Sequence, residues 1–244
     1  MLGEGSVRPP MYILAHHKCA TVFIARYMRA YCSMNALTMF QTHLSGVRLL
    51  HPHDVVVMTN ASYGSLFGEI EGGIHVIRNP LDLIVSAYYS HKATHPVDAW
   101  PELAVQRRVL CSVDRHDGML LTLSFLERED FFEGAEGPLR ALRRWNFDDQ
   151  RFANVRMEDL VRLPNEVLGP LLQAQRPDLT LPDAENHTFE AVTGRAPGVI
   201  DDGSHYRSGR PDQWRTELPQ SVVEYVRAHF RPLLDRFYPE VLAS

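Results

Sequence analysis

The sequence of 244 residues predicts a three-layer α/β/α fold with a central parallel sheet. Three short runs, residues 11–15, 54–59 and 73–78, have the dense apolar content of strands covered on both faces. The first and the third are each followed at once by a helical pattern, as in the strand–helix units of parallel sheets. We expect one domain over residues 1–244, with residues 1–10 flexible.

Composition excludes several classes of protein. The chain is 45% hydrophobic and 23% charged, which excludes a disordered chain, and its net charge of −5 argues against a general nucleic-acid binder. The cysteines, Cys19, Cys32 and Cys111, lack the spacing of a disulfide framework or a cysteine zinc site. No early apolar run is long enough for a signal sequence or a membrane span. We therefore expect a cytoplasmic protein without a membrane span, a nucleic-acid partner or a bound metal.

The segment after the first predicted strand has the features of an anion-binding loop. It reads His-His-Lys-Cys-Ala-Thr over residues 16–21, and apolar residues then recur at helical spacing over residues 22–31. Backbone N–H groups and the helix dipole favour an anion at such a helix start. Lys18 adds a positive charge, and only two of the 25 basic residues are lysines. Thr21 can cap the helix or bind a phosphate oxygen. The Walker A pattern is absent, which disfavours an ordinary P-loop kinase or GTPase.

The third predicted strand ends in a second candidate site. Asn79 and Pro80 are a typical cap and first-turn pair, so a helix should begin directly after the strand. Arg78 then lies at the carboxyl edge of the sheet, where open α/β folds bind ligands. Ser86 follows about two turns into that helix.

These segments resemble the sulfotransferases that use 3′-phosphoadenosine 5′-phosphosulfate (PAPS), whose fold is similar to that of P-loop NTPases. The first loop of that family, Pro-Lys-Ser-Gly-Thr-Thr-Trp, is matched at Lys18, Thr21 and Phe23. Residues 78–89 match every named position of Arg-Asn-Pro-x-Asp-x-x-x-Ser-x-Tyr-Tyr. Residues 155–160 resemble the family's Tyr-Glu-Asp-Leu stretch, and residues 207–214 resemble its late Arg-Lys-Gly-x-x-Gly-x-Trp loop.

The resemblance implies an enzyme that transfers a sulfuryl group from PAPS to a hydroxyl, or an amine, of a small molecule, lipid or sugar, and leaves adenosine 3′,5′-bisphosphate (PAP). It implies that Lys18 stabilises the leaving 5′-phosphate, that Arg78, Ser86 and Arg207 hold the 3′-phosphate, and that Phe23 stacks on adenine. The donor-binding residues that it implies are His17, Lys18, Cys19, Ala20, Thr21, Val22, Phe23, Arg78, Ser86, Met157, Tyr206, Arg207, Ser208 and Gly209.

Four positions depart from the family's pattern. Ala20 replaces the loop glycine, and we expect its methyl group to require a negative φ. Val22 replaces the second threonine and removes one hydroxyl from the phosphate loop. Met157 stands where a tyrosine often contacts adenine, and Ser208 replaces a lysine of the closing loop.

The acceptor side is less determined. Asn60 stands where the family usually has a histidine base, and an amide cannot take a proton. His43 is our first candidate for the catalytic base; other candidates are His17, His53, Glu69 and Glu71. Residues 94–137 read as helices without evident chemistry, and by resemblance they form part of the acceptor wall. Two other functions stay open: a nucleotide or small-molecule kinase with a degenerate phosphate loop, and a non-catalytic PAP-binding protein.

Overall fold

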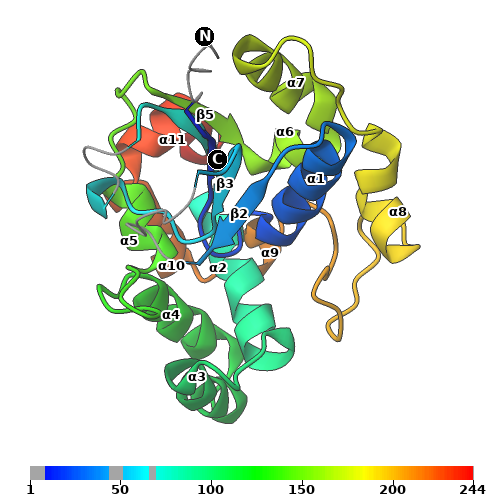
Figure 1. Cartoon of the computed structure of the whole chain (residues 1–244). Coiled ribbons are helices and arrows are strands. Elements are labelled where there is room, and N and C mark those ends of the chain that lie inside the picture. The colour runs from blue at the N-terminus through cyan, green and yellow to red at the C-terminus, as the bar shows by residue number, and fades with distance from the viewer. Residues whose placement is uncertain (1–8, 44–51, 66–69, 244) are drawn as a thin grey trace, which may run out of the picture.

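A five-stranded parallel sheet forms the centre of the molecule (Figure 1). The computed structural model describes residues 9–43, 52–65 and 70–243. The expected flexibility of residues 1–10 therefore falls mostly outside the described residues. The strands pair in the order β2-β3-β1-β4-β5, and every pair is parallel. They are β1 (Met11–Leu14), β2 (Met39–Thr42), β3 (Val55–Met58), β4 (Gly73–Ile77) and β5 (Phe152–Arg156).

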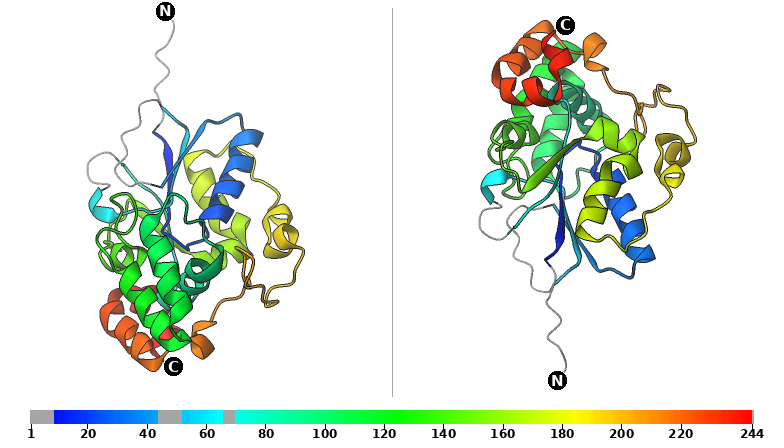
Figure 2. Two further views of the ribbon diagram at one scale, coloured as in Figure 1. Left: turned by 90° about the horizontal axis from the view of Figure 1, so that it is seen from below. Right: turned by 90° about the horizontal axis from the view of Figure 1, so that it is seen from above.

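Helices cover both faces of the sheet, which confirms the predicted three-layer α/β fold (Figure 2). Met11 and Ile13 of β1 pack toward one helical layer, and Tyr12 and Leu14 pack toward the other, because alternate side chains of a strand point to opposite faces. The first layer contains α1 (Thr21–Met34), α6 (Met157–Arg162) and α7 (Pro164–Gln175), with α8 (Phe189–Thr193) outside them.

The second layer is built around α2 (Pro80–Tyr89). A single π-helical turn, Ser90–Thr94, continues this helix. The other helices of the layer are α3 (Pro101–Ser112), α4 (Arg115–Leu126), α5 (Pro138–Arg143), α9 (Trp214–Glu217), α10 (Gln220–His229), α11 (Arg231–Phe237) and α12 (Pro239–Leu242). The apolar pattern from Val222 to Phe237 suggests a single last helix, but the structure has two. Pro232 lies in the first turn of α11, the part of a helix that accepts proline without losing a hydrogen bond, and α10 ends before it.

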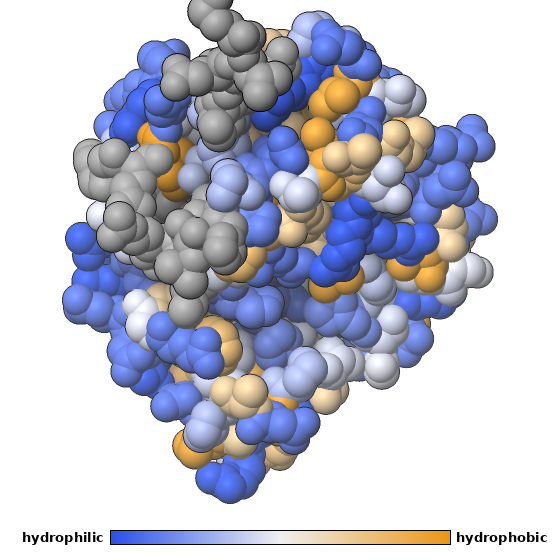
Figure 3. Space-filling model, in the orientation of Figure 1, coloured by the Kyte–Doolittle hydropathy of each residue, from blue (hydrophilic) through white to orange (hydrophobic). Residues whose placement is uncertain are grey.

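Most of the surface seen in Figure 3 is hydrophilic, and its hydrophobic side chains lie in small separate patches. Across the ranges that the structure describes, no helix has the length and the apolar content needed to cross a membrane. The large apolar side chains are instead packed in the two layers on either side of the sheet.

Candidate active site

A cavity of about 1060 Å³ lies at the carboxyl edge of the sheet, where loops after the central strands meet the segment from Asp202 to Gln213. The site residues predicted from the sequence line this cavity, with the exception of Cys19, which is buried. The lining ones are His17, Lys18, Ala20, Thr21, Val22, Phe23, His43, Arg78, Ser86, Met157, Tyr206, Arg207, Ser208 and Gly209. The fold thus brings together residues from five segments that are far apart in the sequence.

The loop between β1 and α1 is a tight turn with left-handed residues. The Cys19 N–H donates to the His16 carbonyl at 2.9 Å, and Lys18 and Ala20 have φ of 66° and 54°. The expectation of a negative φ at Ala20 is therefore wrong. Ala20 is the N-cap, its carbonyl accepts from the Ile24 N–H at 2.9 Å, and no side chain caps the helix, so Thr21 is not a cap. The free first N–H groups of α1 suit an anion.

Replacing Ala20 with glycine should leave the free energy of unfolding unchanged or raise it by up to about 1.5 kcal/mol. The left-handed conformation costs an L-residue roughly 1–2 kcal/mol, and the extra backbone freedom of an unfolded glycine offsets about 0.4–1 kcal/mol of that gain. Ala25, buried inside α1, is the matched control, and its glycine variant should lose about 1 kcal/mol or more. Urea unfolding of both variants measures these free energies. Equal losses of stability in the two variants would contradict the prediction.

The Lys18 side chain is shielded from water and lies near a second positive charge, that of Arg78. Burial, with a further contribution from the nearby Arg78, lowers the pKa of Lys18 from 10.5 to about 7. Nη1 of Arg78 donates to the Lys18 carbonyl at 2.7 Å, so the two cations are fixed to each other through the backbone. Nε of Arg78 is buried and has no partner among the described residues. Two cations and an unpaired buried donor together favour an anionic ligand.

The start of α2 is as predicted, and two carboxylates that the sequence analysis did not single out, one buried and one half-buried, hold it in place. Asn79 caps the helix by accepting from the Leu81 N–H at 3.0 Å. Asp82 accepts from the backbone N–H of Asp212 at 2.7 Å and of Trp214 at 3.3 Å, which ties the late loop to α2. Burial raises the pKa of Asp82. The Asp of the Arg-Asn-Pro-x-Asp motif was visible in the sequence, but its partner loop was not.

Glu158 makes a second tie to the start of α2. One carboxylate oxygen accepts from the Asn79 N–H at 3.2 Å, and the other accepts from the Tyr238 hydroxyl at 2.9 Å. Glu158 therefore joins α6, the start of α2 and the C-terminal helices. Met157, beside it, is half-buried in the cavity wall.

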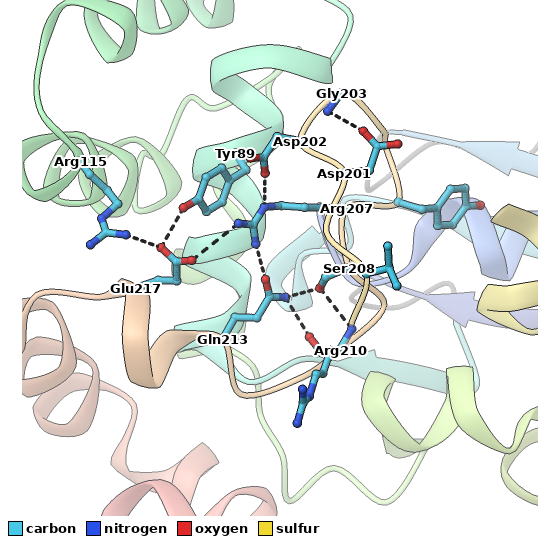
Figure 4. Close-up of polar contacts among 12 residues, drawn as sticks. Tyr89, Arg115, Asp201, Asp202, Gly203, Arg207, Ser208, Arg210, Gln213 and Glu217 are labelled. Carbon is cyan, nitrogen blue, oxygen red and sulfur yellow. Dashed lines mark hydrogen bonds and ion pairs between the residues drawn. The ribbon is translucent and has the colours of Figure 1, made fainter. Parts of the chain in front are cut away.

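Arg207 lines the cavity, and its guanidinium already makes polar contacts with neighbouring side chains (Figure 4). Nε donates to Asp202 at 2.6 Å, Nη1 donates to Gln213, and Nη2 lies 3.6 Å from a carboxylate oxygen of Glu217. The guanidinium also lies over the Tyr89 ring, 3.6 Å from its centroid. These contacts use three of the five N–H groups of Arg207, so a phosphate there must bind the other two or displace one of these partners.

The part of the cavity wall next to His17 is rich in histidine and aromatic side chains. Thr94, His95, Trp100 and Phe132 line it, so the segment from 94 to 137 contributes polar groups that the sequence analysis did not single out. No sequence motif marks these residues, and only their position in the folded structure shows that they line the cavity.

The candidates for the catalytic base differ in whether they line the cavity. His43 lines the cavity, and its Nδ1 lies 2.8 Å from the Thr59 hydroxyl. His53 stacks on Phe40 outside the lining, and Glu71 is exposed outside it. Glu69 lies outside the described residues. No group of three or more His, Cys, Asp or Glu in the described ranges is arranged to hold a metal ion.

This architecture is the sulfotransferase fold, as the comparison with solved structures shows. The mouse sulfotransferase SULT7A1 complexed with PAP is similar over 94% of this chain and 85% of its own, with a TM-score of 0.60 and 12% sequence identity. Retinol dehydratase in complex with androsterone and inactive cofactor PAP is similar over 93% and 81%, with a TM-score of 0.53 and 10% identity. No family model and no curated protein matches the sequence.

Proposed function

We propose that this chain is a PAPS-dependent sulfotransferase acting on a hydroxyl, or an amine, of a small molecule, lipid or sugar. One observation carries the proposal: Lys18 and Arg78, on the loops after neighbouring central strands, face one cavity beside the uncapped start of α1. Both structural neighbours were solved with PAP, which supports the same ligand here.

The residues of the cavity fit a donor with two phosphate groups. The first N–H groups of α1 and Lys18 would hold the 5′-phosphate, and Arg78 with its buried, unpaired Nε would hold the 3′-phosphate together with Ser86. Phe23 and Met157 would form the adenine wall. Arg207 would join the 3′-phosphate site by exchanging Asp202 for phosphate.

PAPS, when bound, supplies an activated sulfuryl group. Transfer of that group resembles phosphoryl transfer, so the protein's part is to position the reactants and stabilise charge on the leaving oxygen. The Lys18 ammonium has the place and the charge for this, and the surrounding low-polarity wall strengthens its effect. Arg78 fixes the Lys18 loop through its carbonyl. Asp82 ties the late loop to α2, and Glu158 ties α6 to the start of α2.

Thermal unfolding in the presence of nucleotides tests the donor. PAP should raise the melting temperature through linkage, and ATP with Mg²⁺ should raise it much less. An equal or larger shift with ATP would favour a kinase. PAP stabilisation without any transfer from PAPS to a panel of hydroxyl and amine acceptors would favour a non-catalytic PAP-binding protein.

Binding of PAP above neutral pH should take up a proton. Lys18 has a pKa of about 7 without donor, so it is mostly neutral at pH 8 to 9. The phosphates favour the ammonium and raise that pKa, so affinity should fall by up to about tenfold as pH rises from 7 to 9. Calorimetry in two buffers of different ionisation enthalpy measures the proton directly. The Lys18→Ala variant should show no such uptake, and a proton-independent wild type would contradict the assignment.

A further inference from the structure

His17, immediately before Lys18, is the first member of a hydrogen-bonded chain that leads into the protein interior. Its Nε2 lies 2.9 Å from Nε2 of His91, and Nδ1 of His91 lies 2.9 Å from the Oε1 atom of Gln106. His91 and Gln106 are buried, whereas His17 lines the cavity. The chain therefore joins the wall beside Lys18 to α3.

The chemistry of these groups determines where each proton lies. Burial lowers the pKa of His17 and of His91 well below 6.5, so both rings are neutral at pH 7. A carbonyl oxygen can only accept, so Nδ1 of His91 carries the hydrogen bonded to Gln106. Nε2 of His91 is then the acceptor, and Nε2 of His17 must donate to it. Nδ1 of His17 is left with its lone pair.

A second pair of histidines shows why this arrangement matters. His16 and His75 also meet through their Nε2 atoms, at 2.7 Å, and Nδ1 of His75 lies 2.7 Å from the Oδ1 atom of Asn154. That pair is entirely buried, and Nδ1 of His16 has no partner within the described ranges. It cannot meet a substrate. His17 differs because its ring borders the cavity and, within the described ranges, its Nδ1 makes no hydrogen bond to another protein group.

We propose that His17 is the general base that takes the acceptor's proton, with His91 and Gln106 as positioning residues. The inference rests on the proposed function. As the acceptor oxygen forms the new S–O bond, its proton moves to Nδ1 of His17. The S–O bond to the 5′-phosphate of PAPS breaks, and its electron pair stays on that phosphate.

Position favours His17 over His43. His17 follows the central strand β1 and directly precedes Lys18, whose charge faces the leaving group. His43 is exposed and follows β2, the outer strand of the sheet. The charged or titratable groups that act on His17 are His91, Lys18, His95 and His205, and the rings of Trp100 and Phe131 pack against it. The imidazolium formed in the reaction keeps its hydrogen bond to His91, which limits the cost of a charge beside Lys18.

The tautomer of His17 can be measured without any acceptor. Nitrogen-15 NMR of histidine-labelled protein with PAP should show His17 protonated at Nε2 and unprotonated at Nδ1 at pH 7. In Gln106→Leu the acceptor for His91 is gone, and a substantial fraction of His17 should change to the Nδ1–H form. A wild-type His17 that carries its proton on Nδ1 would overturn the proposal.

Reverse transfer from aryl sulfates to PAP tests the chemistry, because the base of the forward reaction is the acid of the reverse one. With phenyl sulfate, whose leaving group needs a proton, His17→Asn should lose roughly 10²-fold or more in kcat/KM. With p-nitrophenyl sulfate, whose phenolate leaves without a proton, the loss should be less than about tenfold. Equal losses with both esters, or none, would overturn the proposal.

His116→Asn, an exposed change on α4 outside the cavity lining, is the control for loss of a histidine. It should behave as the wild type with both esters. A wild type that transfers from neither ester and fails to bind PAP would refute the proposed function instead, while the NMR result would still decide the state of His17.

Discussion

Replacing Lys18 with alanine should lower turnover by roughly 10²-fold or more, because the lost interaction grows as charge develops on the leaving oxygen. Affinity for PAP at pH 7 should fall by less than about tenfold, since the N–H groups of α1 and the helix dipole still hold the 5′-phosphate. Steady-state kinetics and calorimetry on the same preparation separate the two effects.

The chain offers a matched control in its other lysine. Lys92 donates to the Tyr88 hydroxyl at 3.1 Å outside the cavity lining, and Lys92→Ala should keep wild-type turnover. Lys18→Arg should not rescue activity, because a planar guanidinium does not replace a compact ammonium in so short a loop. Full activity in Lys18→Ala would remove Lys18 from the mechanism and leave the cavity with a nucleotide-binding role only.

Replacing Arg78 with alanine should weaken PAP binding by roughly 1.5–3 kcal/mol, the usual scale for a hydrogen bond to a charged group. The variant loses the buried Nε donor, and it also loses the hydrogen bond that Nη1 makes to the Lys18 carbonyl. Turnover at saturating donor should therefore fall too, since the Lys18 loop is no longer fixed.

Calorimetric titration with PAP measures the effect of Arg78→Ala. Arg231→Ala is the control, because Arg231 is exposed and pairs with Asp235 on α11, outside the cavity lining. Unchanged PAP affinity in Arg78→Ala would place the 3′-phosphate elsewhere in the cavity. The guanidinium of Arg207 would then be the next candidate, through the N–H groups that its contacts with Asp202 and Glu217 do not use.

Local sequence determined the elements that bear the site. Apolar runs made β1, β3 and β4 recognisable, and the Asn79–Pro80 pair marked the start of α2, because strand burial and helix capping depend on neighbouring residues. The order of the motifs was enough to predict the sulfotransferase fold. The two edge strands, β2 and β5, were missed, since their mostly half-buried residues show no strong pattern.

Tertiary structure alone decided the conformations and partners that depend on distant residues. Ala20 adopts a left-handed φ because the turn after β1 imposes it, whatever the local preference of alanine. Arg207 is held by Asp202 and Glu217, and His17 meets His91 across a separation of 74 residues. Such contacts form where loops meet at the carboxyl ends of parallel strands. The pattern of residues along the sequence does not show which side chains meet there.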